Sequence, residues 1–89
     1  MSNLVDFGLR LARVRKGRGF SQEKLAHEVA LASGTISKYE NGKLPPGFEQ
    51  LNSLADALDV SLDWLVRGRG AAPAWLAGGR DMRSRRKAA

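Results

Sequence analysis

Few residues in this sequence could carry out catalytic chemistry. It contains no cysteine and one histidine, His27, and its acidic residues occupy positions typical of helix caps and solvated faces. It has no glycine-rich phosphate loop and no group of residues with the spacing of metal ligands. We therefore predict no enzyme activity, no metal and no cofactor, and we expect His27 to be a solvated residue on the outer side of a helix.

The chemistry that remains is hydrogen bonding and charge. The net charge is +6, but residues 1–68 hold nine basic against eight acidic residues, whereas residues 69–89 hold six basic residues against Asp81 alone. The tail therefore accounts for +5 of the charge. Nucleic-acid binding by the folded part must consequently be argued from a motif and not from the overall charge.

Apolar residues recur at helical spacing along the first two thirds of the chain. Phe7, Leu11 and Val14 fall on one stripe, and similar patterns continue until about residue 66. Ser21 and Ser61 are placed as N-caps, and no segment alternates with a period of two. We predict an all-α fold of five helices, near residues 6–16, 22–29, 33–40, 48–58 and 61–66.

The composition changes after Gly68 to glycine, alanine and arginine. We predict a domain over residues 1–68 and a disordered basic tail over residues 69–89, in which Ala74, Trp75 and Leu76 could form a docking segment. No apolar run reaches the ~20 residues that span a bilayer, and a chain without cysteine suits a reducing compartment. The expected location is the cytoplasm, at the nucleoid.

Three blocks of sequence carry a resemblance to a known family. They are FSQEKLA at residues 20–26, TISKYENGK at residues 35–43 and LADALDVSLDWL at residues 54–65. Together they resemble the lambda-repressor and Cro type of helix-turn-helix regulator, also called the XRE family, over residues 7–68. The resemblance implies a lambda-repressor-like domain that binds double-stranded DNA through a helix in the major groove.

The resemblance implies that residues 33–40 form the recognition helix. Once Ile36 and Tyr39 are assigned to the core, five residues face outward and become the expected base contacts: Ser33, Gly34, Thr35, Ser37 and Lys38. Lysine can donate to guanine, a threonine methyl can meet thymine, and serines are adaptable hydrogen-bonding groups.

Further residues match family positions around that helix. Gln22, Asn41, Lys43 and Arg15 are the expected DNA backbone contacts, and Arg15 is also expected to form an ion pair with Glu40. For Gln22 and Lys43 the alternative is a solvated side chain, for Asn41 it is a C-cap role, and for Arg15 and Glu40 it is two independent surface charges.

The sequence departs from the family pattern at three positions. Ala30 and Asp59 stand where glycine is usual, and Ala32 replaces the usual serine cap of the third helix. These departures leave the start of the recognition helix uncertain by one residue, with Ser33 as the other candidate cap.

The function predicted from these residues is sequence-specific DNA binding and regulation of transcription, more often repression than activation. We expect a homodimer on a palindromic operator, with Trp64, Leu65 and Trp75 as candidate dimer contacts. The basic run from Arg80 to Lys87 is a candidate for added phosphate contacts, and the alternative for it is a flexible solubilising end. The alternative is a protein-binding regulator, such as an antitoxin, that uses the same fold. RNA or membrane binding by the tail is disfavoured because the tail lacks interleaved aromatic residues and an amphipathic stripe.

Overall fold

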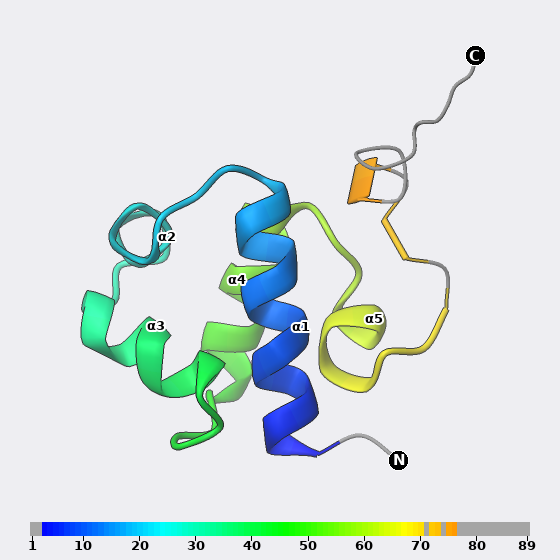
Figure 1. The fold of residues 1–89 in the computed structure, drawn as a ribbon, viewed down its shortest axis with the longest axis horizontal. Helices are drawn as coiled ribbons and strands as arrows, with labels where there is room; N and C mark the ends of the chain where they lie inside the picture. Colours follow the sequence, from blue (N-terminus) through cyan, green and yellow to red (C-terminus); the bar gives the residue numbers. More distant parts are fainter. Residues whose placement is uncertain (1–2, 71, 74, 77–89) are drawn as a thin grey trace.

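The structure, a computed structural model, describes residues 3–70, 72–73 and 75–76. Within these residues the chain forms five α-helices and no β-strand, which confirms the all-α prediction (Figure 1). The helices are α1 (Leu4–Gly17), α2 (Gln22–Glu28), α3 (Ser33–Glu40), α4 (Phe48–Leu58) and α5 (Leu62–Arg67). Helix α1 begins two residues before the predicted Asp6, because Asn3 Oδ1 accepts a hydrogen bond from the Asp6 amide at 2.8 Å and caps the helix.

The two predicted serine caps are confirmed. Ser21 Oγ accepts from the Lys24 amide at 3.0 Å, and Ser61 Oγ accepts from the Trp64 amide at 3.1 Å. Each hydroxyl satisfies a backbone donor that the first turn of its helix would leave without a partner. Helix α3 begins at Ser33 with Ala32 as its N-cap, and this cap makes no side-chain hydrogen bond.

Two non-glycine residues have left-handed backbone conformations. Ala30, in the turn between α2 and α3, has a φ of 58°, and Asp59, after α4, has a φ of 56°. These are the two positions at which the family resemblance implies glycine. Ala30 and Asp59 therefore adopt the left-handed conformation that glycine adopts easily, and their Cβ atoms make this conformation energetically unfavourable.

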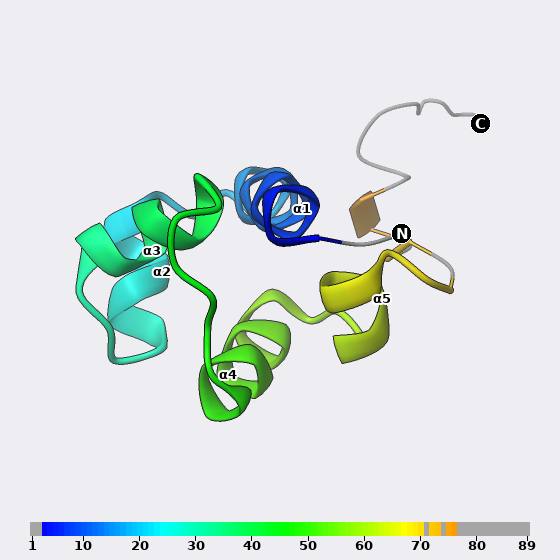
Figure 2. The same cartoon turned by 90° about the horizontal axis from the view of Figure 1, so that it is seen from below.

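Helix α1 lies in the middle of the fold. Figure 2 shows it nearly end-on, with α2 and α3 on one side, α5 on the other and α4 facing it. Gly8 allows α3 to approach closely, since a Cβ at this position would lie 2.5 Å from the carbonyl oxygen of Glu40. The core residues with no exposed side-chain surface come from all five helices: Leu11, Val14, Leu25, Ile36, Leu54, Leu58 and Leu65.

Three large apolar residues of α4 and α5 differ in their burial. Phe48, the first residue of α4, is 71% exposed. Trp64 and Leu65, the candidate dimer contacts on α5, are 6% and 0% exposed. Their side chains are buried in the core of their own chain, and their contact with a second copy stays a prediction.

Trp75 and Leu76 pack against the folded domain. A Cβ on Gly17, at the end of α1, would lie 2.9 Å from side-chain atoms of both residues. The Trp75 indole N–H donates to the Asp59 carbonyl oxygen at 3.3 Å. Trp75 is thus an intramolecular contact here, whereas Ala74 and the basic run from Arg80 to Lys87 lie outside the described residues. Among the described helices, none is long and apolar enough to cross a membrane.

Candidate nucleic-acid interface

Helix α3 presents a polar face to solvent. Ile36 and Tyr39 are buried at 0% and 4% exposure and fix the helix against α1 and α2. The residues expected to contact bases lie on the remaining surface, where three are exposed and two are half-buried: Ser33, Gly34, Lys38, Thr35 and Ser37. A Cβ on Gly34 would meet no atom within 4 Å, so another molecule can approach the backbone there.

A buried hydrogen-bond network ties α3 to α1 and α2. Arg15 Nε lies 2.5 Å from Glu40 Oε2, and Arg15 Nη2 donates to Glu40 Oε1 at 3.2 Å. The two side chains are only 9% and 6% exposed. The carboxylate therefore receives a bidentate, charge-assisted contact from α1, in agreement with the ion pair predicted for these two residues.

Gln22 extends this network in a way that sequence reasoning missed. Its side-chain Nε2 donates to Glu40 Oε1 at 3.0 Å, across 18 residues of sequence. Arg15 also donates from Nη1 to the Phe20 carbonyl oxygen at 2.7 Å, which fixes the turn before α2. Because its guanidinium is bound to Glu40 and to the Phe20 carbonyl oxygen, Arg15 serves mainly to position α3 and has little capacity left to bind a phosphate.

Asn41 is the C-cap of α3. Its side-chain Nδ2 donates to the Ser37 carbonyl oxygen at 2.9 Å and lies 3.3 Å from Ser37 Oγ. This arrangement fits the capping alternative weighed for Asn41. Lys43 is exposed, and its backbone amide donates to the Lys38 carbonyl oxygen at 2.9 Å, so the turn holds this lysine next to the end of α3.

Burial also affects the one tyrosine of the chain. Desolvation raises the pKa of the Tyr39 hydroxyl above its ordinary value. A neutral phenol is thus favoured on the inner side of α3.

Arg10, on α1, is a structural residue. Its Nε donates to the Leu65 carbonyl oxygen at 3.0 Å, and its Nη2 donates to the Val66 carbonyl oxygen at 2.6 Å. These carbonyls lie in the last turn of α5, where a cation is favoured. Arg10 thereby joins α1 to α5 over 55 residues of sequence, and no local signal could have revealed this pairing.

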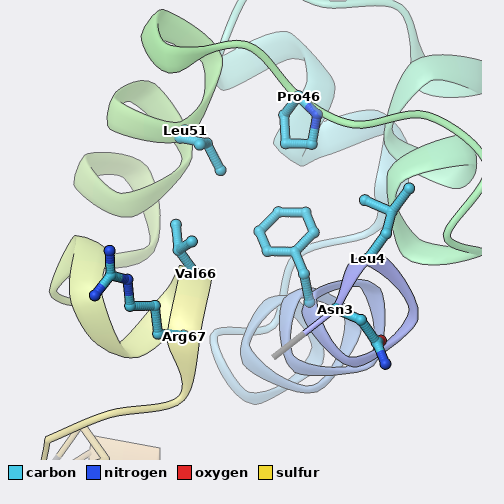
Figure 3. A pocket seen from close by; sticks show the side chains of 7 residues that line it. Asn3, Leu4, Pro46, Leu51, Val66 and Arg67 are labelled. Atoms are coloured by element: carbon cyan, nitrogen blue, oxygen red, sulfur yellow. The ribbon is translucent and has the colours of Figure 1, made fainter. Parts of the chain in front are cut away.

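An apolar groove lies on another part of the surface, between α1, α4 and α5. Figure 3 shows side chains from these helices and from the loop before α4 converging on it. The groove has a volume of about 350 Å³ and is lined by Asn3, Leu4, Phe7, Pro46, Leu51, Val66 and Arg67. The exposed side chains of Phe48 and Leu44 belong to α4 and to the loop before it.

Comparison with known proteins identifies the family. The family model described as Helix-turn-helix matches residues 11–65, and the chain belongs to this family. This match confirms the resemblance to lambda-repressor-type regulators drawn from the three sequence blocks.

Two curated relatives illustrate the range of the family. The chain is 37% identical over 62 residues to a prophage-derived, uncharacterized HTH-type transcriptional regulator, YonR, of Bacillus subtilis; the match covers 70% of this chain and 57% of that protein. It is 39% identical over 56 residues to the cryptic phage CTXphi transcriptional repressor RstR of Vibrio cholerae, covering 63% of this chain and 50% of the repressor. The chain thus spans about half the length of these relatives, whose names are those of transcription regulators and not of enzymes.

Solved structures agree with the fold. The P22 c2 repressor, solved in complex with a synthetic operator, gives a TM-score of 0.69 at 32% identity and covers 71% of this chain and 96% of that one. The restriction-modification controller protein C.AhdI of Aeromonas hydrophila gives a TM-score of 0.67 at 35% identity, covering 70% and 94%. SinR, a master regulator of biofilm formation solved in complex with DNA, gives 0.62 at 32% identity, covering 66% and 95%.

Proposed function

We propose that this chain binds double-stranded DNA in a sequence-specific manner and regulates transcription, as a repressor. The observation that carries the proposal is the polar outward face of α3, held in place by two buried residues and by the Arg15–Glu40–Gln22 network. Relatives of the same fold have been solved on operator DNA, as the P22 c2 repressor illustrates. Operator binding would take place at the nucleoid in the cytoplasm.

In this proposal α3 enters the major groove with its N-terminal part at the base edges. Thr35 and Lys38 read bases through a methyl group and an ammonium group, while Ser33 and Ser37 supply short hydroxyls. Lys43, at the end of the turn after α3, contacts a phosphate. Gln22 meets a phosphate through its backbone amide, because its side chain is already bound to Glu40.

We further propose that the chain acts as a homodimer on a palindromic operator. Two copies related by a two-fold axis present two recognition helices to two half-sites. The apolar groove and the exposed Phe48 support this proposal, because both are apolar surface of the kind that interfaces cover. The same surface favours a second candidate function, the binding of a different protein in the manner of an antitoxin.

Selection of bound duplexes from a random DNA pool at near-physiological salt tests the proposal. We expect enrichment of a two-fold symmetric site. Thr35→Ala and Lys38→Ala should each lose about 1 to 3 kcal/mol of discrimination at one operator position, while His27→Ala, an exposed change on α2, should lose none. If no sequence is enriched, operator binding is refuted and a protein partner becomes the leading function.

A further inference from the structure

The side chain of Asn41 is held in one orientation at the end of α3. Its Nδ2 donates to the Ser37 carbonyl oxygen at 2.9 Å, and the Asn41 backbone amide donates to the same oxygen at 3.0 Å. A carbonyl oxygen can only accept, so the nitrogen end of the side-chain amide must face Ser37. The same nitrogen lies 3.3 Å from Ser37 Oγ. Because an amide nitrogen can only donate, the Ser37 hydroxyl oxygen accepts this bond.

The Ser37 hydroxyl keeps one hydrogen to donate. Serine hydroxyls within helices often donate to a carbonyl oxygen of the preceding turn. Within the part of the chain that the structure describes, the hydroxyl of Ser37 makes no such bond, and its one partner is the Asn41 amide. Ser37 is half-buried on α3, which lies at the edge of the fold away from α5 (Figure 1). The hydroxyl hydrogen is therefore available to a molecule that covers this side of α3.

A hydroxyl fixed in this way distinguishes between bases. Guanine presents two acceptors, N7 and O6, along its major-groove edge, whereas cytosine presents an amino donor. Against guanine the Ser37 hydrogen finds an acceptor. Against cytosine the hydroxyl can accept through its second lone pair, but its hydrogen is then buried without an acceptor, which costs free energy. Without Asn41, the hydrogen could turn to a carbonyl oxygen of the helix, and cytosine would be bound without that cost.

We propose that Asn41 is a positioning residue for base reading. It orients the Ser37 hydroxyl as a hydrogen-bond donor, so that Ser37 selects guanine over cytosine at one position of the operator. This inference rests on the proposed binding of DNA by α3. It adds the base that Ser37 selects and the residue that imposes the choice, and it gives Asn41 a role beyond capping the helix.

The test measures the Kd of the full chain for its selected operator and for operators with each other base at every position. Ser37→Ala identifies the position that Ser37 reads, because the preference should fall there. At that position we expect the natural chain to bind guanine about 5- to 30-fold more tightly than cytosine, the range that one unsatisfied buried donor produces.

Asn41→Asp reverses the hydrogen bond to Ser37. The new carboxylate accepts the hydroxyl hydrogen and leaves only lone pairs for the DNA. The preference should shift toward cytosine, with a change of at least about 10-fold in the ratio of the two Kd values. Repulsion between the carboxylate and the phosphates weakens both complexes and cancels in the ratio. In a Ser37→Ala chain, the same substitution should leave the ratio unchanged.

Asn41→Leu is the second variant, because leucine is of similar size and has neither a donor nor an acceptor. It should reduce the preference for guanine to about 2-fold or less, since the hydroxyl can then turn either way. Urea denaturation checks that each variant folds. If Asn41→Asp does not fold, Asn41→Leu and its combination with Ser37→Ala provide the same test.

The outcomes separate this inference from operator binding. If Ser37→Ala changes the preference at no position, or if both Asn41 variants keep the ratio of the natural chain, the role of Asn41 is overturned while operator binding stands. A shift that persists in the Ser37→Ala background overturns it as well, because the carboxylate then contacts the base itself. A chain that selects no operator refutes the reading of DNA by α3, and with it this inference.

Discussion

Ala30 shows how a single residue can hold a backbone conformation that it does not favour. A left-handed alanine costs roughly 1 to 2 kcal/mol because its Cβ crowds the following carbonyl, and Ala30 has a φ of 58°. Its side chain is at the surface. A substitution at Ala30 can therefore relieve the strained backbone conformation without changing the packing of the core.

Ala30→Gly should raise the free energy of unfolding by about 0.5 to 1 kcal/mol. Relief of the strained conformation outweighs the greater entropy that glycine gives to the unfolded chain. Urea denaturation measures the effect. Ala12→Gly is the matched control, because Ala12 lies within α1 and should lose about 0.5 to 1 kcal/mol. A destabilised Ala30→Gly would show that the turn is not strained.

Tyr39 makes stability depend on pH at alkaline values. Because burial raises its pKa, the folded chain keeps the phenol proton at pH values where the unfolded chain has lost it. The unfolded state then binds fewer protons, so the free energy of unfolding falls as pH rises from about 10 toward the raised folded pKa. Denaturation at about pH 8 and about pH 11 should show a smaller fall for Tyr39→Phe than for the natural chain. Equal falls would contradict the assignment.

At the scale of the element, α3 begins without a side-chain cap. Ala32 has the extended backbone that a capping residue needs, with φ −76° and ψ 146°. Ala32→Ser should stabilise the domain by about 1 kcal/mol, because its hydroxyl can accept from a free amide in the first turn. Ser21→Ala provides the opposite case, since it removes the bond to the Lys24 amide and should cost about as much. Thermal and urea unfolding of both variants would reveal the two signs.

Glu40 connects three elements, since its carboxylate binds Arg15 of α1 and Gln22 of α2. Glu40→Gln should lower the free energy of unfolding by about 3 to 5 kcal/mol, because a buried guanidinium loses its counter-charge. Arg67→Gln is the control: it breaks the exposed pair with Asp63 and should change stability by less than about 0.5 kcal/mol. Similar losses in the two variants, measured by urea denaturation, would argue against a special role for the buried network.

The sequence was informative wherever a local rule applied. The spacing of Phe7, Leu11 and Val14 predicted the buried face of α1, and all three are buried. Ser21 and Ser61 marked helix starts because capping requires a short polar side chain at a fixed offset from a free amide. The outward face of α3 was also predicted by a local rule: once Ile36 and Tyr39 were assigned to the core, the remaining residues of the helix had to face outward.

Apart from the Arg15–Glu40 pair, which the family resemblance implied, features that depend on long-range contact could not be predicted. The bonds from Arg10 to the end of α5 and from Gln22 to Glu40 join residues far apart in sequence, where periodicity carries no information. Trp75 and Leu76 form a pair too short to show a period, so their docking on Gly17 was undetermined.

At the scale of the whole molecule, the apolar surface around Phe48 has no cover within the described part of the chain. Phe48 is 71% exposed and Leu44 is 38% exposed, and α4 also contributes Leu51 to the groove. If a two-fold axis passes near the start of α4, each copy can place Phe48 against the groove of the other. An isologous contact buries every such residue twice, which doubles its effect on assembly.

Phe48→Ser should therefore weaken the dimer strongly. Burial of a phenylalanine side chain contributes about 1.5 to 3 kcal/mol, so two copies contribute about 3 to 6 kcal/mol, and the dimer Kd should rise at least 100-fold. Sedimentation equilibrium measures this change. Leu9→Ser is the matched control, because Leu9 is 63% exposed but belongs to α1 and not to α4. If Leu9→Ser dissociates the dimer and Phe48→Ser does not, the interface lies on the exposed face of α1. A two-fold axis at that face would then set the distance between the two α3 helices.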